Sequence, residues 1–108
     1  MIYGNEILVI QQKTVTENSL GEQVESWKDV ANVIGFLDLM SNQQNISTHL
    51  ASIIESSHVF ICDYKKIDVD VEICRGVIDG RIYDLKYIDD PMNLHKHLEI
   101  FLDYIGGQ

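Results

Sequence analysis

The side chains that could do chemistry in this chain are few and scattered. His95 and His97 share one parity with Glu99, so a strand would place all three on one face, where imidazole and carboxylate groups can bind a metal ion. Spacing indicates no further ligand elsewhere, and alternating polar residues are typical of any solvated strand face. The pattern therefore favours an ordinary surface over a metal site, and no metal or other cofactor is expected.

Other reactive residue types lack the neighbours that would activate them. Five serines lie between Ser41 and Ser57, but none is in a nucleophile elbow or another activating motif. The seven glycines are dispersed and form no phosphate-binding loop. Asp68 and Asp70 could be drawn as a carboxylate pair, yet such acids at the start of a strand are ordinary surface. No catalytic residue is predicted, and the chain is not expected to be an enzyme.

Length and cysteine content indicate a small reduced protein. A chain of 108 residues forms one domain, here residues 1–108, that buries roughly two thirds of its unfolded surface. Cys62 and Cys74 sit inside strand-like runs, where free cysteine behaves as a small hydrophobe, so two reduced thiols are favoured over a disulfide. No apolar run approaches the roughly 20 residues of a membrane span. Synthesis in a cytoplasm and no membrane partner are therefore expected.

The charge balance narrows the class of partner. Seventeen acidic and eight basic side chains give a formal net charge of −9. Proteins that grip a phosphate backbone need clustered Lys and Arg, but the only adjacent basic pair, Lys65-Lys66, lies beside Asp63 and Asp68. An oligonucleotide-binding barrel, the rival from another class, needs a basic and aromatic face that is not found. An acidic surface does suit a protein that lets DNA slide past without binding.

Period-two alternation predicts a strand-rich fold. Val69–Ile88 reads as two strands hinged on Asp79-Gly80, the favoured dipeptide of a two-residue hairpin turn, with Tyr83, Leu85 and Tyr87 toward the core. The other expected strands are Glu6–Gln12, Glu22–Trp27, Val30–Met40, His58–Tyr64 and Leu94–Ile105. These elements predict a mainly β fold, a small antiparallel β-barrel formed by a rolled sheet of six or seven strands.

Several features refine this expectation. Glu6–Gln12 is apolar on both parities, which indicates a strand covered on both faces. Lys13–Gly21 is predicted to be a polar connector with turn residues. Gly35 indicates a bulge or a bend that helps the sheet curl. Trp27 is read as a core anchor, with an interface anchor as the alternative.

The stretch Ser41–Ser57 differs in composition from the rest of the chain, since Glu55 is its only charged residue. Ser41 with Gln44 matches a capping box. An apolar stripe follows at helical spacing, formed by Ile46, Leu50, Ile53 and Ile54. One short helix within a long mobile segment is therefore predicted, because a helix of this length depends on packing for its stability.

Four motifs in order carry a family resemblance. Ile10-Gln11-Gln12 is followed by Gly21–Val30, which resembles a G-x-x-V-x-x-W-x-D-V signature. His58–Tyr64 is similar to an H-x-V-x-I-x-Y strand with the tyrosine displaced by one, and Ile78–Leu85 is similar to a D-G-x-x-Y-x-I hairpin with leucine in the last place. Together, from Glu6 to Tyr104, they resemble the phage head–tail joining family of head-completion and head-closure ("stopper") connectors. The chain departs from that family at Asn42-Gln43-Gln44, where glycine and an acidic residue are common.

The resemblance implies a structural protein of the virion neck, made in the host bacterial cytoplasm. Its subunits would form a homo-oligomeric ring below the portal and adaptor proteins, close the DNA-filled head and receive the tail proteins. Genomic DNA would pass through the channel without specific binding. Another neck or tail-completion protein with the same barrel is the alternative within this class.

Two segments are predicted to act in assembly. The candidate channel-closing residues are Ser41, Asn42, Gln43, Gln44, Asn45, Ser47, Thr48, His49 and Ser52. The candidate subunit-interface residues, in and after the polar connector, are Thr14, Thr16, Asn18, Leu20 and Trp27. The apolar stripe of the first segment leaves two interpretations open. The segment either moves on assembly or is a fixed helix that plugs one end of the barrel.

Overall fold

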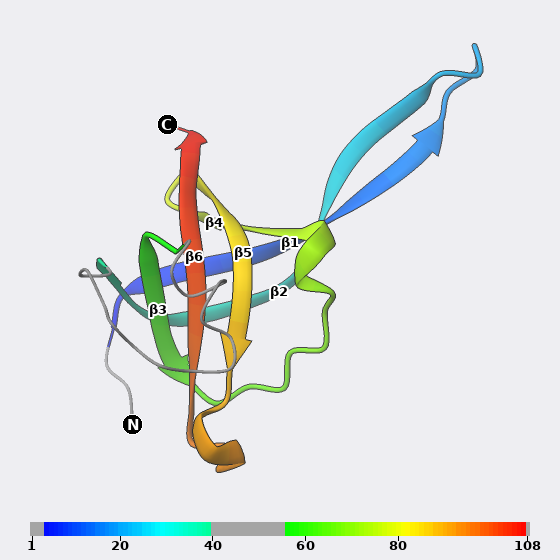
Figure 1. Cartoon of the computed structure of the whole chain (residues 1–108). Helices are drawn as coiled ribbons and strands as arrows, with labels where there is room; N and C mark the ends of the chain where they lie inside the picture. Colours follow the sequence, from blue (N-terminus) through cyan, green and yellow to red (C-terminus); the bar gives the residue numbers. More distant parts are fainter. Residues whose placement is uncertain (1–3, 40–55, 108) are drawn as a thin grey trace.

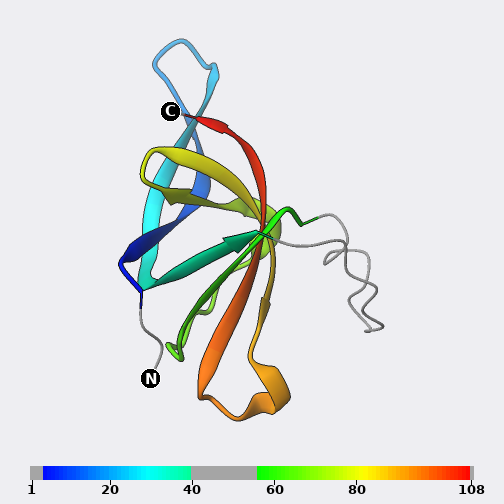
Figure 2. The same cartoon turned by 90° about the vertical axis from the view of Figure 1, so that its left-hand side faces the viewer.

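Six antiparallel strands form a closed sheet in the computed structural model of the protein, which describes residues 4–39 and 56–107 (Figure 1). The strands are β1 (Glu6–Glu17), β2 (Gln23–Leu39), β3 (His58–Asp63), β4 (Cys74–Ile78), β5 (Arg81–Asp89) and β6 (His97–Gly107). Their order around the sheet is β1-β2-β3-β6-β5-β4. Figure 2, a view turned by 90°, shows that the strands wrap unevenly around the core. The predicted mainly β, rolled antiparallel barrel is confirmed.

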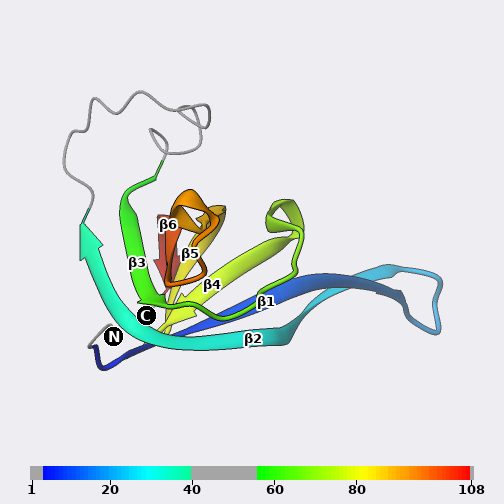
Figure 3. The ribbon, with the colours of Figure 1, turned by 90° about the horizontal axis from the view of Figure 1, so that it is seen from below.

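Strand β2 is one long strand where two were predicted, and the division at residues 28–29 was wrong. Ile10 of β1 pairs with Ala31, but Gln11 pairs with Asp29, so Val30 is the extra residue of a β-bulge. A bulge shifts the alternation of side chains without ending the strand. The change of pattern at this point therefore marks a distortion within β2, which curves strongly around the barrel (Figure 3).

Gly35 lies where β2 passes from one neighbour to the next. It pairs with Glu6 of β1 and with Cys62 of β3. A Cβ atom at this position would lie 2.1 Å from the backbone oxygen of Ile61, so only glycine permits the approach of the two strands. Gly35 therefore serves the predicted bend, while the bulge falls at Val30.

The Asp79-Gly80 hairpin is confirmed, but the strand predicted before it begins later. Asp79 and Gly80 have φ of 50° and 80°, as a type I′ turn requires, and they join β4 to β5. Residues Val71–Ile73 form a 3-10 turn, η1, instead of a strand. The Asp70 carboxylate accepts a hydrogen bond from the Glu72 N–H at 3.0 Å, and this cap competes with extended pairing.

The later strands depart from their predicted alternation in two places. Tyr83 and Leu85 are buried as expected, but a register shift between Leu85 and Tyr87 leaves Tyr87 half-buried against Phe101. Strand β6 begins at His97 rather than Leu94, because a second 3-10 turn, η2 (Pro91–Asn93), and the left-handed backbone of His95 precede it. Tyr104, for which alternation with Leu98, Ile100 and Leu102 predicts a position in the core, is exposed.

The core is apolar and drawn from all six strands. Its fully buried side chains include Leu8, Ile10, Phe60, Ile78, Tyr83, Ile100 and Leu102. Cys62 and Cys74 are buried in it as free thiols, as predicted, and burial raises the pKa of Cys62 to about 11. The predicted helix and the channel-closing residues from Ser41 to Ser52 lie outside the described residues.

Candidate assembly site

A two-stranded arm extends from the barrel and is the most distinctive feature of the described chain. It consists of Lys13–Trp27, the distal half of the β1–β2 hairpin, and it points away from the other strands in both Figure 1 and Figure 3. The molecule measures 48 Å along its longest axis and 28 and 27 Å along the others, a difference that the arm accounts for. The polar connector predicted at Lys13–Gly21 is therefore wrong up to Glu17, where β1 ends.

Residue type explains why a polar stretch forms a strand here. Thr14, Val15 and Thr16 are β-branched and favour extended backbone whatever their polarity. Each pairs across the ribbon, and the Thr14 hydroxyl lies 2.7 Å from the hydroxyl of Ser26. Hydropathy alone did not separate such a ribbon from a loop.

The turn at the tip of the arm is held by one side chain. The Asn18 carboxamide oxygen accepts hydrogen bonds from the backbone N–H groups of Leu20 and Glu22, both at 2.9 Å. Gly21 has φ of 81° and donates its N–H to the backbone oxygen of Asn18 at 3.0 Å. This turn presents Leu20 to solvent with 81% of its surface exposed.

A polar network fixes the base of the arm against the barrel. The Arg75 guanidinium of β4 lies 4.1 Å from the ring centroid of Trp27, and its Nε donates to Gln11 Oε1 at 2.9 Å. Gln11 in turn donates to Asp29 at 2.8 Å. Because both strands are tied to β4 through Arg75, the arm leaves the barrel in a defined direction.

The five predicted interface residues divide into three groups. Thr16 and Leu20 are exposed and Thr14 is partly exposed, as a contact surface requires. Asn18 builds the turn. Trp27 is half-buried on the outer face beneath Arg75, because the alternation of side chains along β2 turns it away from the barrel interior. The prediction that Trp27 is a core anchor is therefore wrong. An interface role for any of the five stays a prediction.

A second surface, the outer patch, was missed by the sequence reading. It lies on the outside of β1, β2 and β3 and consists of Ile7, Val9, Ile34, Phe36 and Ile61. Ile7 pairs directly with Ile34, and Phe36 with Ile61, so these side chains adjoin. Ile34 is 62% exposed and Phe36 36%. The sequence signal for this patch was the presence of apolar residues on both parities of Glu6–Gln12, which predicted a strand covered on both faces. Among the described residues of one subunit, the outer face of this strand is uncovered.

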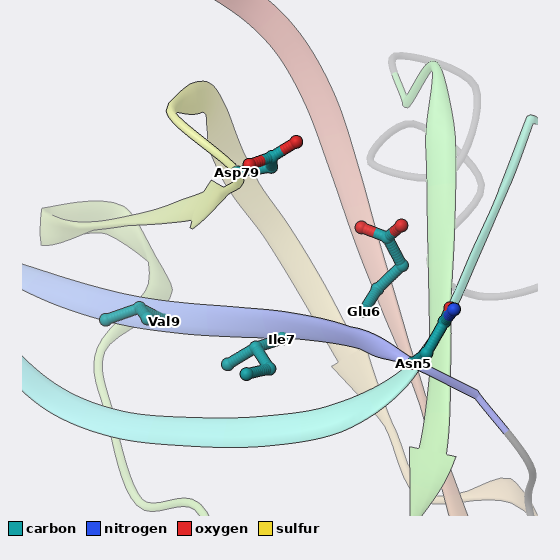
Figure 4. A pocket seen from close by; sticks show the side chains of 5 residues that line it. All are labelled: Asn5, Glu6, Ile7, Val9 and Asp79. Atoms are coloured by element: carbon teal, nitrogen blue, oxygen red, sulfur yellow. The ribbon is translucent and has the colours of Figure 1, made fainter.

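A shallow hollow adjoins the outer patch at the end of the barrel. It is lined by Asn5, Glu6, Ile7, Val9 and Asp79, and Figure 4 shows the Glu6 side chain extending toward the β4–β5 turn that bears Asp79. Two carboxylates without a further ligand do not form a metal site, and the described residues contain no group of three or more potential ligands.

The histidines near the last strand have local partners. His95 precedes β6 and contacts the Asp90 carboxylate, while His97 Nε2 lies 3.3 Å from Glu99. The shared strand face considered for these residues therefore does not form, because His95 lies outside the strand.

Ser57 and His58 attach the start of β3 to β6. The Ser57 hydroxyl accepts a hydrogen bond from the Tyr104 N–H at 2.8 Å and lies 2.7 Å from His58 Nδ1. The His58 ring packs edge-on against Tyr83. Burial, helped by the charge of Arg81 and opposed by that of Asp103, lowers the pKa of His58 below its ordinary value of 6.5.

Nearly the whole chain is similar to a known protein family. The family model of the phage head completion protein matches residues 4–104, nearly the whole chain. The chain belongs to the phage head completion protein family. No curated protein matches it significantly.

Membership of this family gives the protein a structural role in closing the phage head. The family implies contacts with other head and tail proteins and a place at the neck of the virion. The resemblance drawn from the four sequence motifs is thereby confirmed. Among the described residues, no helix has the length and apolar character to cross a membrane.

Acidification is expected to destabilise the protein through His58. Its lowered folded pKa means that the unfolded chain binds the proton more readily, so stability falls as pH drops through about 6.5 toward the folded pKa. His58→Gln is expected to flatten the dependence of unfolding free energy on pH between about 6.5 and 5. Urea titrations of the wild-type protein and the His58→Gln variant measure the unfolding free energy at each pH. The difference in unfolding free energy between the two proteins at pH 7.5 is the reference value. Parallel pH profiles would rule out His58 as the source.

Proposed function

We propose that this protein is the subunit of a homo-oligomeric ring that lies below the portal and adaptor proteins and provides the attachment site of the tail. The observation that supports a ring is the arm: a preformed ribbon that projects from the barrel and presents an exposed leucine at its tip. A two-stranded ribbon without a further layer is marginally stable in water, so it gains most from a partner. The proposed role is structural, without enzymatic activity.

Genomic DNA is proposed to pass through the ring without specific binding. The net charge of −9 supports this, because acidic side chains around a channel repel the phosphate backbone. The segment from Ser41 to Ser52 remains the proposed channel-closing element, on the strength of its near lack of charge.

Assembly in solution tests the proposal. The purified protein is mixed with portal–adaptor complexes, and its mass is followed by size-exclusion chromatography with light scattering. The proposal expects a multimer of several copies, alone or bound to the portal–adaptor complex. A monomer that binds neither itself nor the complex would contradict the ring, and tight binding of single-stranded oligonucleotides at physiological salt would favour the rival barrel.

A further inference from the structure

The arm has two chemically different faces. Residues directly opposite in the ribbon share a face, so Lys13, Val15 and Glu17 lie with Trp27, Glu25 and Gln23 on the outer side. The other side, here called the neutral face, consists of Thr14, Thr16, Val24 and Ser26. Its Thr14 and Ser26 hydroxyls bond to each other, and Val24 with the threonine methyl groups supplies its apolar part.

The neutral face continues the inner face of the barrel. Leu8 and Ile10 of β1 point into the core, and the same parity leads through Gln12 to Thr14 and Thr16. Beyond the base of the arm no other described strand covers this side. Lys28, which pairs with Gln12, is the charged residue of this side at the base of the arm. Beyond it, the four uncharged residues of the neutral face are covered by no described strand of their own barrel.

The outer patch is the second uncovered neutral surface. None of its five residues is charged, and three of them, Ile7, Ile34 and Phe36, are exposed. Contiguous exposed apolar surface of this kind marks interaction sites in soluble proteins.

One subunit cannot cover its outer patch with its own arm. Both surfaces lie on β1 and β2, with Ile7 and Ile34 near one end of the paired segment and Thr16 and Val24 near the other. A continuously paired ribbon cannot fold back on itself, and Figures 1 and 3 both show the arm pointing away from the barrel. The two surfaces can meet only between copies.

We propose that the neutral face of the arm of one subunit packs on the outer patch of the next subunit in the ring, an inference that rests on the proposed ring. Identical copies of charge −9 repel each other, so their contact is favoured where both surfaces are neutral. In this arrangement Lys13, Glu17 and Glu25 stay on the water side of the arm. The contact joins two different patches and so repeats head to tail, which is the geometry that generates a ring.

Paired cysteines test this contact. Val24→Cys combined with Ile34→Cys places one thiol on the neutral face and one in the outer patch. The matched control, Glu25→Cys with Ile34→Cys, moves the first thiol to the opposite face one residue away. Cys62 and Cys74 are buried, and the pKa of each is raised by burial, so they add little background. Both variants are oxidised as free protein and after addition of portal–adaptor complexes.

The first variant is expected to form a ladder of disulfide-linked multimers, with about tenfold more cross-linked chain than the control, because the bond requires close Cβ atoms. Equal cross-linking of both variants, or cross-links only to a portal or adaptor chain, would overturn the contact. A multimer seen by light scattering without the ladder overturns the contact and leaves the proposed ring standing. A protein that stays monomeric in every mixture overturns both.

Discussion

Phe60→Ala is expected to cost about 3–5 kcal/mol of unfolding free energy, the range for removing a buried aromatic ring. Phe60 is fully buried on β3 and belongs to the central cluster with Leu8 and Ile100. Domains of this kind are stable by only about 5–15 kcal/mol, so the loss is a large part of the total. Urea denaturation followed by circular dichroism measures it, and a protein already unfolded in buffer agrees with the prediction.

Phe36→Ala is the matched control for this prediction. Phe36 lies on the neighbouring strand β2, one position before the residue that pairs with Phe60, but it faces outward and is exposed. Its removal is expected to change stability by less than about 1 kcal/mol, as for other surface substitutions. If the two variants lost equal stability, the assignment of inner and outer faces on β2 and β3 would be wrong.

Shortening the arm is expected to abolish head completion while the barrel stays folded. Replacing residues 16–24 with Asn-Gly joins the directly paired Val15 and Glu25 by a two-residue hairpin turn. The deleted residues contribute no side chain to the core, so the melting temperature should fall by only a few degrees, equivalent to about 1 kcal/mol. Complementation of phage that lack the protein, scored as infectious titre, is expected to fall to background.

An arm of full length with altered charge is the control for the deletion. Lys13→Gln with Glu25→Gln removes an exposed ion pair of 3.7 Å and keeps the neutral face. Such exposed pairs contribute little to stability, so this variant should complement fully. Full complementation by the shortened arm would show that the arm is dispensable.

The barrel was predictable from the sequence because apolar and polar side chains alternate along its strands. Tyr83, Leu85, Leu98 and Ile100 follow period two and are buried, and Asp79-Gly80 allowed one hairpin geometry. The errors arose where local interactions compete with alternation. The Asp70 cap turned Val71–Ile73 into a 3-10 turn, and the bulge at Val30 made one strand resemble two.

The assembly surfaces were predictable only in part. Thr14, Thr16 and Leu20 were singled out, but as part of a connector, because polar β-branched residues in an unsupported ribbon carry no hydrophobic alternation. The outer patch was missed because an apolar residue on a strand does not reveal which side the barrel closes on. Strand order and register decide that, and they come from long-range pairing such as Gly35 with Cys62.

The fate of particles made without this protein tests its central role most directly. Heads assembled from the phage genome with this gene interrupted are purified, and their DNA content and attached tails are counted by electron microscopy. A head completion protein that closes the head and receives the tail predicts heads that package DNA, lose it afterwards and carry no tails. Particles that retain their DNA and bear tails as the wild type does would contradict the account.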